Sequence, residues 1–163
     1  MKSWGLFFCL LVFTGLFTQA QVLDEHLPAG PFPVPGQIYG PDGQQIGIAR
    51  VYPQYVEIFN ADEKLLGKVG ILIQRGSAQL QMVNQDHSLT LIGYAKHGRI
   101  FDSNDQVKGT YFWTPTYSFV HNLEGKRVGS TRCIAWPRVC SVGVAGFLLG
   151  LINAEEPKHE TNP

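Results

Sequence analysis

The chain has 163 residues, with 13 basic and 13 acidic side chains and no formal net charge. This length fits a single domain. Hydrophobic residues make up 44% and charged residues 16% of the chain, which is typical of a globular protein and excludes a charge-rich disordered one. A balanced charge gives no reason to expect a nucleic acid, an acidic lipid surface or another polyanion as partner.

The first twenty residues have the layout of a secretory signal peptide. Lys2 supplies a basic start, residues 4–17 form an apolar run, and small residues precede Gln21. An uncleaved membrane anchor is the alternative, but a span needs roughly twenty apolar residues. We predict cleavage after Ala20, which would remove Cys9, and export to the periplasm or the medium.

Residues 21–36 form a proline-rich lead-in. Proline lacks a backbone donor and has a fixed φ, so we expect an extended segment outside any sheet. Asp24, Glu25 and His26 near its start could form a catalytic or metal cluster, although a solvated polar tail is favoured so close to a new terminus. The prolines are Pro28, Pro31, Pro33 and Pro35.

A ten-residue frame recurs through the next part of the chain. Copies cover residues 38–47, 58–67, 100–109 and 120–129, and an eleven-residue copy covers 83–93. Each has an apolar first residue, a turn pair and a closing glycine. Asp, Asn and Gly accept the left-handed geometry of tight turns, so each copy predicts a β-hairpin. The turn pairs are Asp42-Gly43, Asp62-Glu63, Asp86-His87, Asn104-Asp105 and Glu124-Gly125, and the closing glycines are Gly47, Gly67, Gly93, Gly109 and Gly129.

The closing glycines allow two interpretations. A glycine weakens a strand unless a bulge forms there or another backbone comes close. We favour close approach of neighbouring hairpins over a purely local bulge. Lys108 interrupts the apolar residue that precedes the other four glycines, and the adjacent Val107 suggests a shifted register in that copy.

Single hairpins are marginal in water, so the copies must pack on one another. Their irregular spacing disfavours a solenoid, and radial closure would protect the strand edges. The frame I-[YF]-x-x-[DN]-[GDE]-x-x-[IL]-G, with a small apolar tail after it, resembles the bacterial five-fold β-flower proteins, which are exported or envelope-associated. The resemblance covers residues 36–151. It implies an all-β fold of five radially arranged hairpins, and no activity or catalytic residue.

Cys133 and Cys140 are the two cysteines that remain after cleavage, with six residues between them. An even pair in an exported chain predicts a disulfide, and free thiols are the alternative. A zinc site would need further ligands, and a redox pair usually has the C-x-x-C spacing.

Residues 141–153 are apolar but too few to span a membrane. We expect this segment to pack on the hairpin array, as a last strand or a short helix, and to complete a domain over residues 37–153. Exposure to lipid or to a partner is the less favoured alternative. The polar residues 154–163 are expected to be a disordered tail.

No motif for hydrolysis, zinc, phosphate or dinucleotide binding is present. The spacing brings no two of the candidate histidines together, so we predict no catalytic residue, metal or cofactor. Aromatic residues could line a sugar-binding face, although packing is favoured for them. The histidines are His87, His97, His121 and His159, and the aromatic residues are Trp113, Tyr117, Phe119 and Trp136.

The sequence therefore predicts an exported, non-enzymatic structural or binding module of unknown ligand, in which self-association is possible. The alternative is a small envelope hydrolase or carbohydrate-active protein with a site built from several hairpins. His97 or His121 beside a carboxylate in a pocket would favour that alternative.

Overall fold

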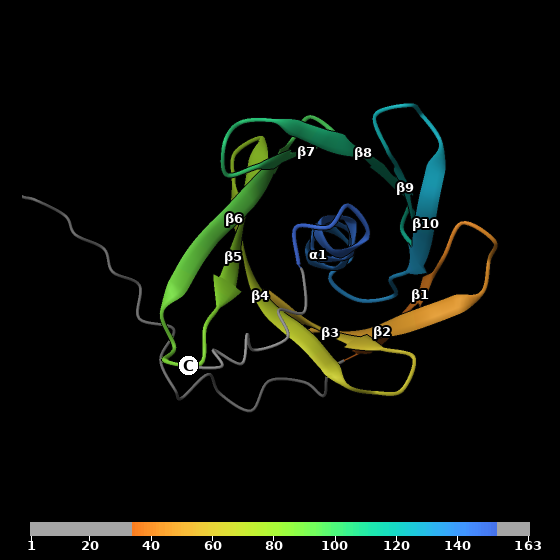
Figure 1. Ribbon diagram of the computed structural model, residues 1–163, viewed down its shortest axis with the longest axis horizontal. Coiled ribbons are helices and arrows are strands. Elements are labelled where there is room, and N and C mark those ends of the chain that lie inside the picture. Colours follow the sequence, from red (N-terminus) through yellow and green to blue (C-terminus); the bar gives the residue numbers. More distant parts are fainter. Residues whose placement is uncertain (1–33, 153–163) are drawn as a thin grey trace, which may run out of the picture.

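The computed structural model describes residues 34–152, which form a closed antiparallel barrel of ten strands with an α-helix (Figure 1). The predicted signal peptide, most of the proline-rich lead-in and the polar tail lie outside the described residues. The strands are β1 (Val34–Tyr39), β2 (Gln45–Val51), β3 (Tyr55–Asn60), β4 (Leu65–Gln74), β5 (Ser77–Val83), β6 (Leu89–Lys96), β7 (Arg99–Asp102), β8 (Val107–Trp113), β9 (Tyr117–His121) and β10 (Arg127–Arg132).

The strands follow one another around the barrel in chain order, and β1 pairs with β10 to close it. Closure leaves no free sheet edge, so the expected all-β class and the protection of edges are both confirmed. β1 begins at Val34, inside the segment expected to lie outside the sheet. Pro35 is tolerated because β1 pairs with β10 only from Gln37 onward, so the missing N–H costs no bond on that side.

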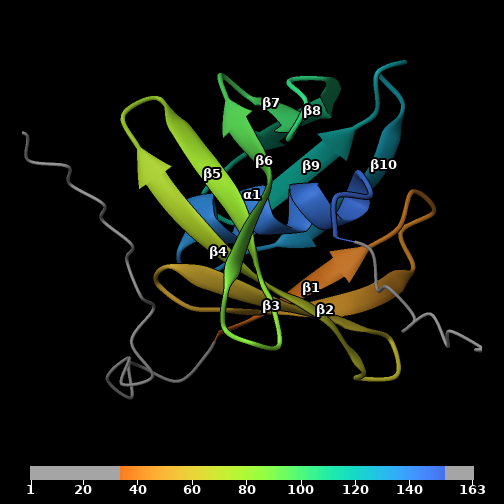
Figure 2. The same cartoon turned by 60° about the vertical axis from the view of Figure 1, so that its left-hand side comes forward.

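The helix α1 (Pro137–Leu148) lies along the inside of the barrel (Figure 1). Figure 2 shows the same helix from the side, with strands in front of it and behind it. The helix contacts strands on all sides, β2 to β5 and β7 to β10. Its residues 139–146 are all buried, as expected of a helix that is apolar on every face. The tail is therefore core, as expected, but it fills the barrel instead of covering it.

Large residues and glycines alternate around one level of the barrel interior. The odd-numbered strands contribute a large residue, and the even-numbered strands contribute a closing glycine directly opposite. A ten-stranded barrel is wider than one that its own side chains can fill, and the glycines leave the space that the helix occupies. The large residues, none of them exposed, are Ile38, Ile58, Leu80, Ile100 and Val120.

The predicted close approach at the glycines is confirmed for four of the five. A Cβ on Gly47, Gly93, Gly109 or Gly129 would meet a backbone carbonyl of the next hairpin, namely that of Phe59, Phe101, His121 or Tyr39 respectively. The fifth, Gly67, faces the side chains of Met82 and Ile152. Leu148, at the end of α1, and Leu149 and Leu151, just after it, lie against the glycines as well. This ring of glycines thus brings hairpins close to one another and to the helix.

A bulge precedes every closing glycine, so the two interpretations of these glycines hold together. Each hairpin has its register shift at this place, and the bulged residue 108 takes the same position as 46, 66, 92 and 128. Lys108 therefore marks no special shift. The longer copy differs from the prediction, because Leu80 and not Val83 lies opposite Gly93, and Val83 pairs with Leu89.

The five turns share one backbone pattern. In each, the N–H of the first residue donates to the carbonyl of the fifth, and the N–H of the fourth donates to the carbonyl of the first. The fourth residue has a positive φ, which glycine adopts without strain. The predicted turn pairs are thereby confirmed as turn positions. The first residues are Gly40, Asn60, Asn84, Asp102 and Asn122, and the fourth are Gly43, Glu63, His87, Asp105 and Gly125.

The predicted disulfide is present between Cys133 and Cys140, whose Cα atoms are 6.0 Å apart. Cys133 follows β10, and Cys140 lies on the first turn of α1 after Pro137. The bond therefore joins the last strand to the helix at the point where the helix enters the barrel.

Candidate functional site

Among residues 34–152 no fully buried side chain is acidic or basic; the half-buried Tyr111 packs against the core, and loss of solvation raises its pKa. The buried polar side chains of the described part are Ser118, Thr131 and Ser141. The hydroxyl groups of Ser118 and Thr131 donate to the carbonyls of Phe112 and Gln37. Ser141 Oγ, on the helix, makes no hydrogen bond. A binding or catalytic site of this barrel must therefore lie on its outside.

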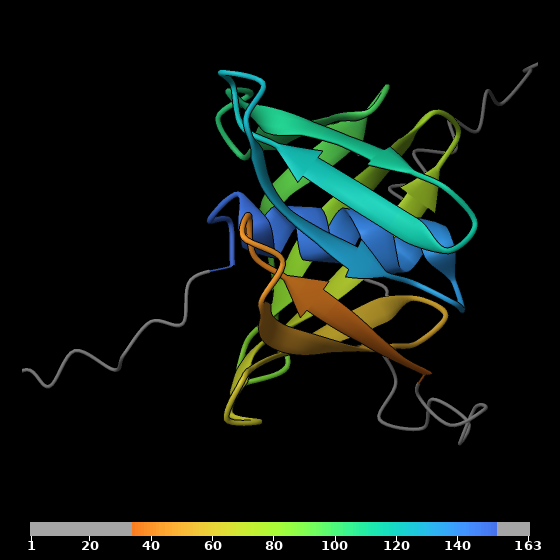
Figure 3. The ribbon, with the colours of Figure 1, turned by 90° about the vertical axis from the view of Figure 1, so that its right-hand side faces the viewer.

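The barrel has two different ends, which lie at opposite sides of Figure 3. We call one of them the turn end. It comprises the five turns and the two residues on either side of each turn. The turns cover residues 40–44, 60–64, 84–88, 102–106 and 122–126. We call the other the loop end. It comprises the connections on that side of the barrel and the two residues on either side of each connection. The connections cover residues 52–54, 75–76, 97–98, 114–116 and 133–136.

The turn end is rich in acidic residues, three of which accept backbone hydrogen bonds within the turns. It carries seven acidic against four basic side chains. Asp102 Oδ1 accepts hydrogen bonds from the backbone N–H groups of Asn104 and Gln106, at 2.9 and 3.0 Å. Asn60 and Asn122 accept two such bonds each in the same way. Hydrogen bonds from Ser88 hold the pKa of the Asp86 carboxyl below its usual value. Formation of the turns therefore explains the side chains that accept these hydrogen bonds.

The loop end has the opposite charge. It carries six exposed cations and neither Asp nor Glu. They come from five different strands or turns and from the first turn of the helix, so only the fold brings them to one end. The six are Arg50, Arg75, Lys96, Arg99, Arg132 and Arg138.

Exposed aromatic and aliphatic side chains accompany these cations. Phe112 is 64%, Ile134 62% and Trp136 45% exposed, and Trp113 and Tyr117 are exposed as well. On the outer face, Tyr117 stacks near Phe119, with ring centroids 6.4 Å apart. Packing was the favoured role for these aromatic residues, and it holds only for the half-buried Phe119. The other three face solvent at the loop end.

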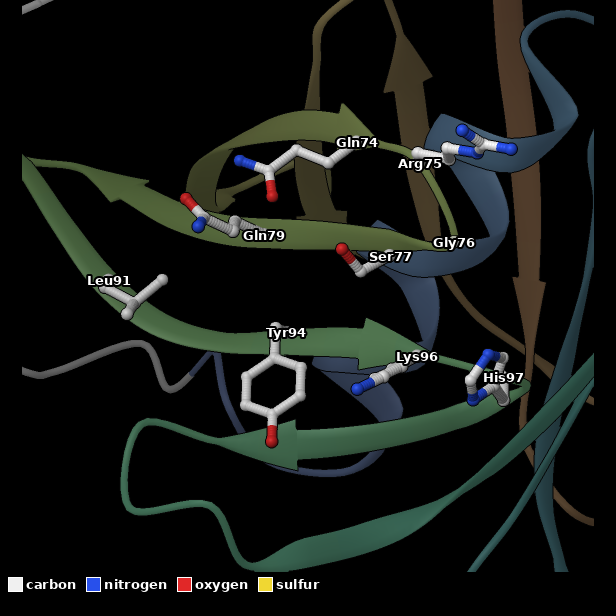
Figure 4. Close-up of a pocket in the computed structure, with 9 residues that line it drawn as sticks. All are labelled: Gln74, Arg75, Gly76, Ser77, Gln79, Leu91, Tyr94, Lys96 and His97. Carbon is white, nitrogen blue, oxygen red and sulfur yellow. The ribbon is translucent and has the colours of Figure 1, made fainter.

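One cavity of about 400 Å³ opens on the outer surface beside the loop end (Figure 4). It lies between β4, β5 and β6 and the turns that follow β4 and β6. Gln74, Gln79 and Ser77 offer hydrogen bonds, and Lys96 is a cation at its rim. The remaining lining residues are Arg75, Gly76, Leu91, Tyr94 and His97.

No carboxylate lines this cavity. His97 lies at its edge in the tight turn 97–98, with a positive φ, but no acidic partner stands beside it there. The pKa of Tyr94 is raised, first by loss of solvation and then by the neighbouring Asp105. The cations, amides and hydroxyl of the cavity can hold an anion or a polar group by charge and hydrogen bonds. The cavity therefore suits binding.

The other candidate histidines are not brought to this cavity. His87 lies at the tip of a turn at the turn end, and His121 lies at the end of β9 with its carbonyl against Gly109. His159 lies outside the described residues, as do Asp24, Glu25 and His26. Within residues 34–152, no group of three His, Cys, Asp or Glu side chains could hold a metal ion.

One row of side chains across the outside of the barrel is held by contacts among its own members. Glu57 lies between Arg50 and Lys68 in the register of β2, β3 and β4. The rings of Tyr52 and Tyr55 stack at 4.1 Å, and Lys68 lies 4.2 Å above the Tyr55 ring. Loss of solvation, with the nearby Tyr52 and Glu57, raises the pKa of Tyr55 to about 12. This row is a structural cluster.

The composition of the loop end could not be found from the sequence, because its cations lie in six separate places along the chain. Overall charge conceals it, because the acidic turn end and the excess of acidic residues outside residues 34–152 together offset the basic loop end. Among residues 34–152 no helix is both long and apolar enough to span a bilayer. Comparisons of the chain with protein-family models, with curated proteins and with solved structures give no match.

Proposed function

We propose that this protein is an exported, non-enzymatic binding module, and that the loop end is its binding surface. The observation that carries the proposal is the filled barrel: a buried helix occupies the interior, so that only the outside can meet a ligand. Apart from Arg50, Tyr52 and Tyr55, which belong to the structural cluster on the side of the barrel, the loop end presents its cations and exposed aromatic side chains to solvent.

We also infer that the five hairpins are copies of one unit arranged radially, as in the β-flower proteins. The shared turn pattern, the repeated bulge and the alternation of large residues with glycines support this inference. Such an array is a rigid platform, because each hairpin is paired on both sides.

Export is part of the proposal. The signal-peptide pattern supports it, and a disulfide fits an oxidising compartment. The hydrolase alternative gains no support from the cavity, because no acidic residue lies beside His97 among its lining residues.

The test combines location with binding. Expressed in a bacterial host, the chain should be recovered from the periplasm or the medium with Gln21 as its first residue. The purified protein is then assayed for retention on anionic vesicles, heparin and cell-wall glycan, and for hydrolysis of ester and glycoside substrates. Retention on one of the three, without turnover, is the expected result. Turnover that His97→Ala abolishes would overturn the proposal, as would a cytoplasmic chain with reduced cysteines.

A further inference from the structure

The loop end combines two kinds of exposed side chain, and a surface that meets only water does not require this combination. Cations and large apolar side chains lie side by side at one end of the barrel, and both kinds are exposed. Large exposed apolar groups on a soluble domain usually mark a contact surface. Aromatic residues with cations around them are typical of surfaces that lie in the interface of an anionic bilayer.

Two of these cations are placed against each other. Lys96 and Arg99 are directly opposite in the register of β6 and β7, with the two-residue turn 97–98 between them. Like charges in that arrangement repel and weaken the pairing of the strands. An anionic group bound between them would remove this repulsion.

Arg132 continues the surface on the other side of the barrel. It is opposite Tyr117 in β9 and Gln37 in β1. Phe112 and Phe119 are opposite each other on the same outer face. A cation therefore adjoins the exposed aromatic side chains, and the pattern is not confined to the cavity between β4 and β6.

The dipole of the helix is aligned with the charge difference between the two ends. α1 starts at the loop end, has no acidic residue in its first turn and runs towards the turn end. Its dipole is positive at its start, so it reinforces the basic loop end and the acidic turn end. A molecule polarised in this way orients in the field of a negatively charged surface.

We propose that the loop end docks on the surface of an anionic phospholipid bilayer, with the cations against phosphate groups and the aromatic side chains in the interface. This inference rests on the proposed function and names the ligand class of the same surface. A lipid surface is favoured over a soluble polyanion, which would not account for Phe112 and Ile134, and over a nucleic acid, whose bases stack on aromatic rings but not on the aliphatic Ile134, which is 62% exposed.

The main test is partition of the purified exported protein onto vesicles. We expect binding to vesicles of phosphatidylglycerol and phosphatidylcholine, and weak binding to vesicles of phosphatidylcholine alone. Each cation near such a surface contributes about fivefold in affinity. The variant Lys96→Gln/Arg99→Gln/Arg132→Gln should therefore lose on the order of a hundredfold in partition. Phe112→Ser should also weaken binding to the anionic vesicles. The salt dependence of binding should change less in this variant than in the triple variant.

The matched control removes three cations from the turn end, in Lys64→Gln/Lys126→Gln/Arg127→Gln. The helix alone separates the two ends by about 18 Å, more than twice the roughly 8 Å over which charges act at physiological salt. The control variant should therefore partition within about twofold of the parent. An equal loss in both triple variants would overturn the proposal, because it would indicate attraction by overall charge.

Intrinsic fluorescence reports the orientation. Trp113 and Trp136, the tryptophans of the described residues, both lie at the loop end, so emission should shift to the blue on anionic vesicles. A control with Trp113→Phe, Trp136→Phe and Leu123→Trp places the indole at the turn end and should show no shift. Binding to heparin or glycan without vesicle binding would overturn this inference and leave the proposed function standing. Substrate turnover that His97→Ala abolishes would remove both.

Discussion

The turn end and the loop end of this barrel are built from the same strands but use polar residues differently. At the turn end, Asn60, Asp102 and Asn122 accept backbone hydrogen bonds, and acidic or amide residues hold the turn geometry. At the loop end the cations project outward, and two of them face each other. The difference teaches that charges required by folding and charges available for binding can be separated along one axis of a small domain.

The largest expected effect tests whether the glycine ring holds the turn end together. Gly109→Val should destabilise the protein by about 3 kcal/mol or more, because the new side chain meets the His121 carbonyl and Leu149. Urea unfolding measures the loss. Gly43→Asn is the matched control: a Cβ there meets nothing within 4 Å, and Asn tolerates positive φ. A loss in Gly109→Val as small as in this control would show that the hairpins do not need the close approach.

The next prediction concerns what stabilises the loop end. Replacing Cys133 and Cys140 together by alanine should lower the free energy of unfolding by about 2–3 kcal/mol, because the bond closes a short loop. Unfolding of the parent with and without a reductant should show the same difference, and the variant should not respond to the reductant. If reduction leaves the parent unchanged, the bond is not what secures the helix to β10.

A smaller effect is expected for the side chains that complete the turns. Asn122→Ala removes the acceptor for the N–H groups of Glu124 and Lys126 and should cost about 1–2 kcal/mol. Asn104→Ala, at the third position of the 102–106 turn, should cost less, because Asp102 and not Asn104 is the acceptor there. Equal losses for the two variants would mean that the backbone alone sets the turn.

Glu63→Gly should stabilise the protein by up to about 1 kcal/mol. Glu63 has φ 60° at a position where two other turns already have glycine, and left-handed geometry strains other residues. The reverse change, Gly43→Glu, should cost a similar amount. Thermal unfolding of both variants checks the pair, and a destabilised Glu63→Gly would contradict the equivalence of the turns.

The smallest expected effect is on pH dependence and concerns Tyr55, in the structural cluster at the margin of the loop end. The pKa of Tyr55 is raised to about 12, so the folded state favours the neutral phenol. This contribution to stability is complete below the ordinary pKa near 10 and is lost as the pH rises towards 12. The pKa values of Tyr52, Tyr94 and Tyr111 are raised as well, so ultraviolet titration of the folded protein should show several late tyrosines, and the latest step should be missing in Tyr55→Phe.

Much of the turn end could be predicted from the sequence, because turn chemistry is local. Asp42-Gly43 and its counterparts occupy the predicted turns, and the closing glycines mark both the bulges and the close contacts. The longer copy was placed wrongly because Leu80 and Val83 are both apolar, and only the pairing decides which lies opposite Gly93.

The position of the helix could not be predicted, for a physical reason. The segment from Pro137 to Leu148 contains valines and glycines, which are weak helix formers, so burial inside the barrel decides its conformation. A short apolar run does not distinguish a buried strand from a buried helix. The exposure of Trp113 and Trp136 and the clustering of distant cations likewise follow only from the closed barrel.

The free energy of unfolding of Lys96→Gln/Arg99→Gln/Arg132→Gln, measured in urea, tests the division between the two ends most directly. If the loop-end cations serve binding and not folding, the variant should be as stable as the parent, or more stable by a few tenths of a kcal/mol because Lys96 and Arg99 no longer repel. A loss of 1 kcal/mol or more would contradict the account, because it would show that the barrel needs these charges in order to fold.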